Sequence, residues 1–333
     1  MQRCPLSNSS VVSEACTFDL RVECCTPATT MGIAINGECM RLSTFCVVVV
    51  GLAFVAGLAP ALLAQVELAE PGIQIIPEDD PGLYNLAVIV HAASLVLALP
   101  LAALGLCLAL VAEKRSIGIP RYIAVAALVA APVGAIAMIA ASATQNWDLY
   151  ATLKEQEPML AVVLLAGVVT LFLSKPAGRL PMIILAACSG VALAFGGYSE
   201  VILANSGVDN ALHATYFLVA SDHAFGLSIA LGALAALVGW VAGSNGRGMI
   251  VLSAIAGAAL LFTGYQMIAI AQQLGLMGMP RRYVDYATPF ADGHMQLSIW
   301  SFAFAAILIA TLAGLAIVRL RWPTPNAADD AAD

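Results

Sequence analysis

Continuous apolar runs of helical length, bounded by charged residues or by Pro and Gly, recur along the whole chain. About 20 apolar residues in a row cross the hydrocarbon core of a bilayer as one helix. The runs do not alternate between apolar and polar positions and are rich in Ala and Leu, which disfavours strands. The pattern therefore predicts an all-α integral membrane protein with about eight transmembrane helices. These lie at 42–65, 84–112, 121–143, 158–174, 181–204, 212–242, 248–272 and 295–319, and the fourth run is the shortest.

Composition supports this class, because 61% of the 333 residues are hydrophobic and only 11% are charged. Soluble domains carry about 25% charged residues. A soluble enzyme, a secreted disulfide scaffold, a disordered protein and a nucleic-acid binder are therefore excluded. The net charge of −7 points to no nucleic-acid partner. Three regions follow: an N-terminal extension over 1–41, a membrane bundle over 42–320 and an acidic tail over 321–333.

The N-terminal extension holds five of the eight cysteines, at Cys4, Cys16, Cys24, Cys25 and Cys39. They form no Cys-x-x-Cys pair, so a zinc or redox motif is a weak interpretation. The extension also lacks the basic, apolar and small-residue order of a signal peptide. We expect a disordered extension or a start codon assigned too far upstream.

Orientation follows from the distribution of Lys and Arg, which concentrate on the cytoplasmic side of membrane proteins. One side of the expected spans receives 11 of the 14 basic residues, and the other side receives only Lys154, Arg281 and Arg282. With an even number of spans both termini are then cytoplasmic, as expected in a bacterial inner membrane. The adjacent arginine pair on the outer side indicates an anionic group there.

The four histidines, His91, His213, His223 and His294, all fall in the outer half of this topology. His91 and His223 lie at similar depth on different helices. Two such imidazoles can bind the iron of one heme from both faces, and the heme propionates would then meet the arginine pair. Spacing alone leaves two other interpretations: histidines packed in the bundle and bonded to Ser, Thr or a carbonyl, or ligands of another metal.

Four segments resemble subunit I of the heme–copper (cytochrome c type) oxidases, and they occur in that family's order. They are VELAEPG (Val66 to Gly72), YNLAVIVHAASLVLALP (Tyr84 to Pro100), LANSGVDNALHATYFLVASDH (Leu203 to His223) and GMPRRYVDYATPF (Gly278 to Phe290). The resemblance covers roughly residues 44–112 and 181–318. It implies a truncated version of the subunit I bundle.

The resemblance also implies roles for individual residues. His91 and His223 match the two axial ligands of the family's low-spin heme. Arg281 and Arg282 match the pair that binds the heme propionates. His213 matches a position that helps to hold a magnesium or manganese ion, and this is the weakest of the correspondences.

Departures from the family pattern concern its oxygen-reducing centre. No histidine lies between His91 and His213, so the family's copper ligands have no counterpart, and we expect no copper. Ser221 stands where the family has the ligand of its high-spin heme. Gln65 stands where the family often has an arginine that bonds the formyl group of heme a. The resemblance therefore implies one low-spin heme, of b or a type.

Three further polar residues carry expectations of their own. Asp222, next to His223, is expected to be neutral or paired, because hydrocarbon penalises an unpaired charge. Glu200 is expected to be a boundary residue bonded to Tyr, Ser or water, with a proton or ion relay as the other interpretation. His294 is expected to be an exposed residue at the membrane interface.

The sequence thus predicts a bis-histidine heme protein of respiratory electron transfer without its own oxygen-reducing centre. Its expected partners are a periplasmic cytochrome c, a copper protein or a quinol, together with membrane lipid and other oxidase-type subunits. Two alternatives remain. One is a terminal oxidase component with cytochrome c oxidase activity, completed by another polypeptide. The other is a non-redox heme sensor, assembly factor or structural subunit. Whether the chain is itself an enzyme stays open.

Overall fold

The computed structural model describes residues 20–25, 30–35, 38–69, 81–115, 118–174, 179–212, 214–241, 247–280 and 288–321. Within these residues, eight helical segments are long and apolar enough to cross a membrane, which confirms the number expected from hydropathy. The fourth is longer than its apolar run of 158–174, because it begins at Trp147 and extends over 28 residues. The chain is an integral membrane protein built from helices.

The helical elements follow one another in a simple order. They are α1 (Leu42–Ala69), α2 (Pro81–Ala93), η1 (Ser94–Ala98), α3 (Leu99–Arg115), α4 (Gly118–Ala143), α5 (Trp147–Lys154), α6 (Glu157–Ser174), α7 (Arg179–Leu203), α8 (Ser206–Leu212), α9 (Tyr216–Val241), α10 (Arg247–Leu276), η2 (Thr288–Phe290) and α11 (Ala291–Arg321). Together α2, η1 and α3 make one span, and so do α5 and α6.

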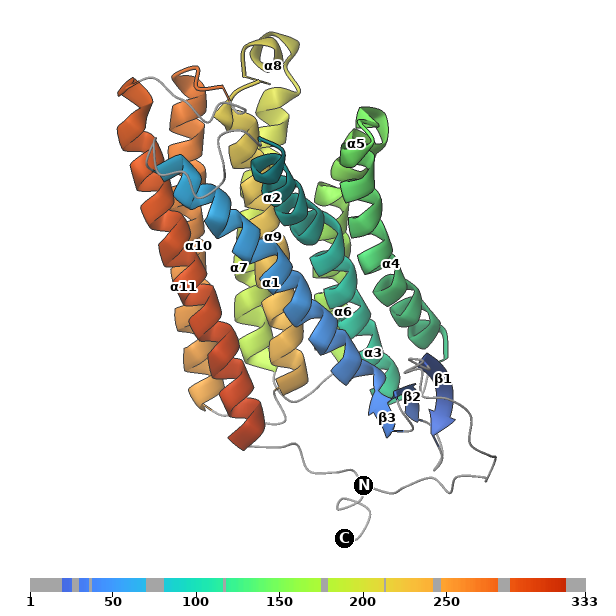
Figure 1. Ribbon diagram of the computed structural model, residues 1–333. Coiled ribbons are helices and arrows are strands. Elements are labelled where there is room, and N and C mark those ends of the chain that lie inside the picture. Colours follow the sequence, from blue (N-terminus) through green and yellow to red (C-terminus); the bar gives the residue numbers. More distant parts are fainter. Residues whose placement is uncertain are drawn as a thin grey trace.

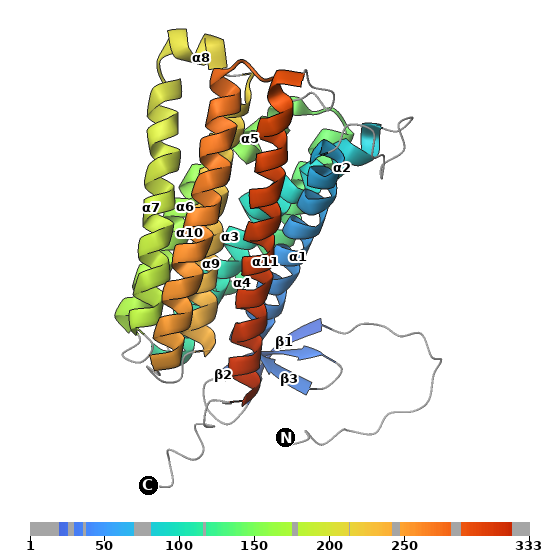
Figure 2. The same cartoon turned by 90° about the vertical axis from the view of Figure 1, so that its left-hand side faces the viewer.

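Helix α9 is the centre of the bundle, with α7, α10 and α11 on one side and the span of α2 to α3 on the other (Figures 1 and 2). In its most apolar stretch 94% of the residues are buried, against 22–28% in α1, α4 and α11. The outer helices instead turn large apolar side chains outward, such as Ile136 on α4 and Leu52 on α1. That pattern is expected where hydrocarbon is the solvent.

Small residues let the neighbours of α9 approach closely. A Cβ atom built on Gly232 would lie 3.1 Å from the Leu164 side chain, and one on Gly239 would lie 2.9 Å from Leu171. Both leucines belong to α6, so glycines on α9 receive a ridge of α6. Near the other end of α9, a Cβ on Gly275 of α10 would overlap with the backbone nitrogen of Phe217. Close backbone contact is the usual way in which membrane helices gain packing energy.

The span that carries His91 is not α-helical throughout. Residues Ser94–Ala98 form η1, a π-helical turn, directly after α2. Such turns are rare and occur frequently next to functional sites. Here the turn begins three residues after His91.

The N-terminal extension contains a small antiparallel sheet that hydropathy does not predict. Strands β1 (Leu20–Cys25), β2 (Thr30–Ile35) and β3 (Glu38–Arg41) pair in that order, and β3 leads directly into α1. The sheet lies at the end of the bundle where α1 begins (Figure 2). Our expectation of an extension without regular structure did not include it, and residues 1–19 lie outside the described residues.

The contact at Gly275 makes a prediction about stability. Gly275→Ala should lower the free energy of unfolding by about 1–3 kcal/mol, because the added methyl group meets the backbone of α9 and forces the helices apart. Gly248→Ala on the same helix is the control, since nothing lies within 4 Å of its Cβ position. Thermal unfolding in detergent compares the two variants, and equal melting temperatures would show that α10 does not contact α9 as described.

Candidate functional site

The His91 ring is held in one orientation by the backbone of α1. Its Nδ1 atom lies 2.7 Å from the carbonyl oxygen of Gly57. A carbonyl oxygen can only accept, so Nδ1 donates, and the Nε2 atom keeps its lone pair. Gly57 is a close-contact position, because a Cβ there would lie 3.4 Å from the Leu95 side chain of η1. The sequence does not predict the hydrogen bond between His91 and Gly57, which are 34 positions apart.

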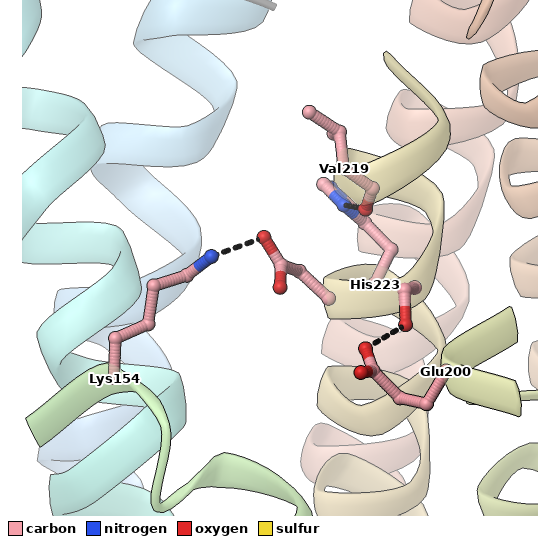
Figure 3. Close-up of polar contacts among 6 residues, drawn as sticks. Lys154, Glu200, Val219 and His223 are labelled. Carbon is pink, nitrogen blue, oxygen red and sulfur yellow. Dashed lines mark hydrogen bonds and ion pairs between the residues drawn. The ribbon is translucent and has the colours of Figure 1, made fainter. Parts of the chain in front are cut away.

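The His223 ring has the same hydrogen-bonding arrangement within its own helix. Its Nδ1 atom lies 2.7 Å from the carbonyl oxygen of Val219, one turn earlier in α9 (Figure 3). Nδ1 therefore donates here too, and Nε2 is again the nitrogen with a free lone pair. A hydrogen bond from one ring nitrogen that fixes the tautomer and orientation of the other is the usual support of a metal-binding histidine.

The fold brings the two rings together from helices that are 132 residues apart in the chain. Their centres are 6.4 Å apart and their planes are inclined by 37°. Stacked rings would be closer, and a direct hydrogen bond of about 2.9 Å between ring nitrogens would bring the centres to about 5 Å. Neither direct contact explains the observed separation.

A metal ion held between the two rings would give a separation of this size. Imidazole nitrogen binds a metal at about 2.0 Å, and the ring centre lies about 1.1 Å behind the nitrogen, so two imidazoles that held one ion between them would have centres about 6.2 Å apart. The observed separation of 6.4 Å matches this value. In donor type, tautomer and spacing His91 and His223 could together hold one metal ion, and their role as heme ligands stays a prediction.

The two histidines lie where two clusters of the hydrophobic core meet. The core divides into a large cluster around α9 and a small one in which Ala93, Val96, Leu97, Met138 and Leu160 pack between α2, η1, α4 and α6. His91 adjoins the small cluster, and His223 lies between Ala220 and Ala224 of the large one. The two rings therefore meet where the clusters meet. Both side chains are half-buried.

Asp222 forms an ion pair with Lys154. The Lys154 Nζ atom lies 2.5 Å from the Asp222 Oδ2 atom, and Figure 3 shows the lysine reaching across from α5 toward α9. About a quarter of the lysine side chain and a third of the aspartate side chain are exposed. The expectation that Asp222 is neutral or paired is thus met by pairing. The contact also gives a partner to Lys154, one of the three basic residues that the charge distribution predicts for the outer side.

Ser221, one residue before Asp222, forms a hydrogen bond to a different helix, α7. Its hydroxyl donates to the Glu200 Oε1 atom of α7 at 2.8 Å, and the serine itself is fully buried (Figure 3). Glu200 is exposed. The expectation of a boundary glutamate bonded to a serine is confirmed. The serine that stands where the family has a heme ligand is engaged in this hydrogen bond.

Glu157 is a polar residue that sequence reasoning missed. It is the first residue of α6 and is only 4% exposed. Among the described residues its carboxyl forms no hydrogen bond and no ion pair. Its Oε1 atom lies 3.9 Å from the Cβ position of Gly226, three residues after His223 on the same side of α9. The signal in the sequence was the second of two acids, Glu155 and Glu157, directly before an apolar run.

Three expected site residues lie outside the described residues: His213, Arg281 and Arg282. The chain that leads to the arginine pair is described. Pro280 pairs with Thr215, and the Tyr216 backbone nitrogen donates to the Met279 carbonyl oxygen at 3.0 Å. The end of α10 is therefore attached to the start of α9, eight residues before His223. The site roles of these three residues stay predictions.

His294 corrects one expectation, because it is not exposed at all. Helix α11 begins at Ala291, before the apolar run that starts at 295, so His294 lies inside its first turn. There its ring meets the Tyr216 ring edge-on, with centres 5.2 Å apart. Four residues later, Ser298 accepts a hydrogen bond from the Gln65 side chain at 2.7 Å. Gln65, which stands where the family often has an arginine, thus joins α1 to α11.

Comparison with known proteins gives relatives for part of the chain, although no protein-family model matches it. Cytochrome c oxidase subunit 1 of Cereibacter sphaeroides is 32% identical over 116 residues, which are 34% of this chain and 20% of that protein. The subunit of Corynebacterium efficiens is 33% identical over 131 residues, 38% of this chain and 21% of that protein. The subunit of Mytilus edulis is 34% identical over 108 residues, 32% and 20% of the two chains.

These matches span about a fifth of the curated relatives. A solved structure, a heme–copper terminal oxidase dimer, aligns with 84% of this chain and 57% of its own at 15% identity and a TM-score of 0.38. The sequence relatives confirm the resemblance seen in the four motifs: the chain is similar to oxidase subunit I over about a third of its length.

The ion pair of Lys154 and Asp222 makes a prediction about coupling. Lys154→Met and Asp222→Asn should each lower the free energy of unfolding by about 1–3 kcal/mol, because each change leaves a polar partner unpaired in a partly buried place. The double variant should lose less than the sum of the two. Lys114→Met, at an exposed lysine near the other end of the bundle, is the control and should change stability by less than about 0.5 kcal/mol. Strictly additive losses would contradict a contact between the two side chains.

Proposed function

We propose that this chain, a divergent and partial relative of cytochrome c oxidase subunit 1, is a membrane-embedded bis-histidine heme protein of respiratory electron transfer. The observation that carries the proposal is the pair of imidazoles with centres 6.4 Å apart and both Nδ1 atoms donating to backbone carbonyls. His91 and His223 would hold the iron through Nε2. The heme, when bound, would supply a one-electron redox couple.

An iron held by both imidazoles would have no open position for a small molecule, which favours electron transfer over activation of such a molecule. Ser221 and Asp222, the residues before His223, are bonded to Glu200 and Lys154. These bonds support a chain that lacks an oxygen-reducing centre of its own. The heme would be of b or a type, and neither copper nor a second heme is part of the proposal.

Topology suggests where electrons enter. Helices α2, α9 and α11 all begin at the same end of the bundle (Figure 1). His91 and His223 each lie within about three turns of the start of α2 and α9. We propose that this end faces the periplasm of a bacterium and that both termini are cytoplasmic. The redox partner would then be a periplasmic cytochrome c, a copper protein or a membrane quinol.

The names of the relatives favour a second candidate, a component of a terminal oxidase that is completed by another polypeptide. That polypeptide would have to supply the copper ligands and the ligand of a second heme. The two candidates differ in whether the purified complex contains copper and reduces oxygen.

Optical spectroscopy of the purified protein tests the proposed ligands. The reduced protein should show the sharp bands of a six-coordinate low-spin heme, and carbon monoxide should not shift them. His91→Ala and His223→Ala should each abolish this spectrum, whereas His294→Gln should retain it. Two histidine variants with the wild-type spectrum would overturn the assignment, and a carbon monoxide shift in the wild type would favour the second candidate.

The arginine pair makes a separate prediction, because positive charge near an iron favours its reduced form. Arg281→Gln and Arg282→Gln should each lower the midpoint potential by on the order of 40 mV, equivalent to about 1 kcal/mol of electrostatic interaction. Arg247→Gln, at the start of α10 and the opposite end of the bundle, is the control and should leave the potential unchanged. A redox titration followed at the heme bands measures the difference. Equal shifts of the midpoint potential in all three variants would show that the arginine pair does not lie close to the heme.

A further inference from the structure

An apolar groove of about 400 Å³ lies between α6 and α7, in the half of the bundle away from the histidines. Val168 and Met182 line it as fully buried residues, whereas Val169 and Ile183 line it with side chains that are 44% and 40% exposed. The described residues that line the groove are all apolar. The groove therefore has a closed floor and opens toward the hydrocarbon of the bilayer.

Along the bundle the groove has the depth of one leaflet. It extends from Leu165 to Phe172 of α6, which is about 10 Å of helix. It ends at Leu165 because α7 comes into contact there: a Cβ on Gly190 would lie 4.0 Å from the Leu165 side chain. The hydrocarbon core of a bilayer is about 30 Å thick, so the groove stops near its middle. A transmembrane helix of a partner needs a groove of full depth, whereas the acyl chain of a lipid reaches only to the middle.

A positive charge lies at the open end of the groove. Arg179 is the first residue of α7 and is exposed. Its guanidinium carbon lies 5.6 Å from the centre of the Phe172 ring, which lines the groove. Attraction between the cation and the ring holds the side chain at this place. A guanidinium can bind one phosphate group through two N–H donors.

We propose that the groove between α6 and α7 binds one anionic phospholipid, with an acyl chain along Val168 and Met182 and the phosphate at Arg179. Depth and charge together select this occupant, because an apolar groove one leaflet deep fits a hydrocarbon chain and the cation at its open end attracts an anionic headgroup. Basic pockets between helices on the cytoplasmic side of a membrane bind such headgroups. The charge distribution predicts that this end of the bundle is cytoplasmic. The site does not depend on the proposed heme.

Native mass spectrometry of the purified chain with dioleoylphosphatidylglycerol and dioleoylphosphatidylcholine tests the charge preference. The wild type should retain one phosphatidylglycerol in preference to phosphatidylcholine. Arg179→Gln should lower the affinity for phosphatidylglycerol about fivefold, the effect of one basic residue on an anionic lipid, and leave that for phosphatidylcholine unchanged. Arg319→Gln is the matched control, because at the same end of the bundle its guanidinium carbon lies 4.7 Å from the centre of the Trp240 ring. This variant should keep the wild-type preference.

The groove itself is tested by filling it. Ala186→Phe places a ring in the groove and should weaken the binding of both lipids. Ala194→Phe is the control, at an exposed position further along α7, and should bind both lipids as the wild type does. Thermal unfolding of the wild type needs no variant to fold: phosphatidylglycerol should raise the melting temperature more than phosphatidylcholine does, and inorganic phosphate should leave it unchanged.

Four results would overturn the proposal. The wild type could retain both lipids equally, or Arg179→Gln and Arg319→Gln could lose the same affinity. Stabilisation by inorganic phosphate alone would show an anion site that needs no acyl chain. A transmembrane polypeptide that copurifies with the wild type and is lost in Ala186→Phe would assign the groove to a protein.

Discussion

Three consecutive polar residues on the most buried helix impose the central constraint on this structure. Ser221, Asp222 and His223 enter a hydrocarbon environment on α9, where an unsatisfied polar group is costly. Successive helical residues point about 100° apart, so the three cannot share a partner. Ser221 bonds to α7, Asp222 pairs with α5, and His223 faces His91 on α2. The neighbours of α9 in this part of the bundle are therefore the helices that bring these partners.

The two halves of the bundle differ in the kind of contact that α9 makes. The half near the start of α9 holds the histidines and the ion pair, and the two hydrophobic clusters meet there. In the other half the contacts of α9 are made by small residues, such as Gly232 and Gly239 against leucines of α6. The close contact of these glycines with α6 holds the helices together there, so the polar half does not have to supply the packing of the whole bundle.

Hydropathy was enough to predict the spans, because each span must be apolar over its whole length. Depth along the helices was enough to select His91 and His223, and their separation could then follow only from the fold. Contacts between distant segments were not predictable: Lys154 and Asp222 are 68 residues apart, and each alone resembles an ordinary boundary charge. The expectation that His294 is exposed was wrong, because the helix begins before the apolar run does. Glu157 was missed for a similar reason, since it precedes its run by one residue.

The π-helical turn η1 has a consequence for how this chain compares with its relatives over evolutionary time. Such a turn contains one residue more than an α-helical turn, so the helix before it and the helix after it belong to different registers. Removal of any one residue from Ser94–Ala98 would restore a continuous α-helix and rotate α2 by about 100° relative to α3. His91 would then face away from His223 although every side chain of the site is kept. A gap of one position in an alignment can therefore separate a chain that merely shares these two histidines from one that brings them together.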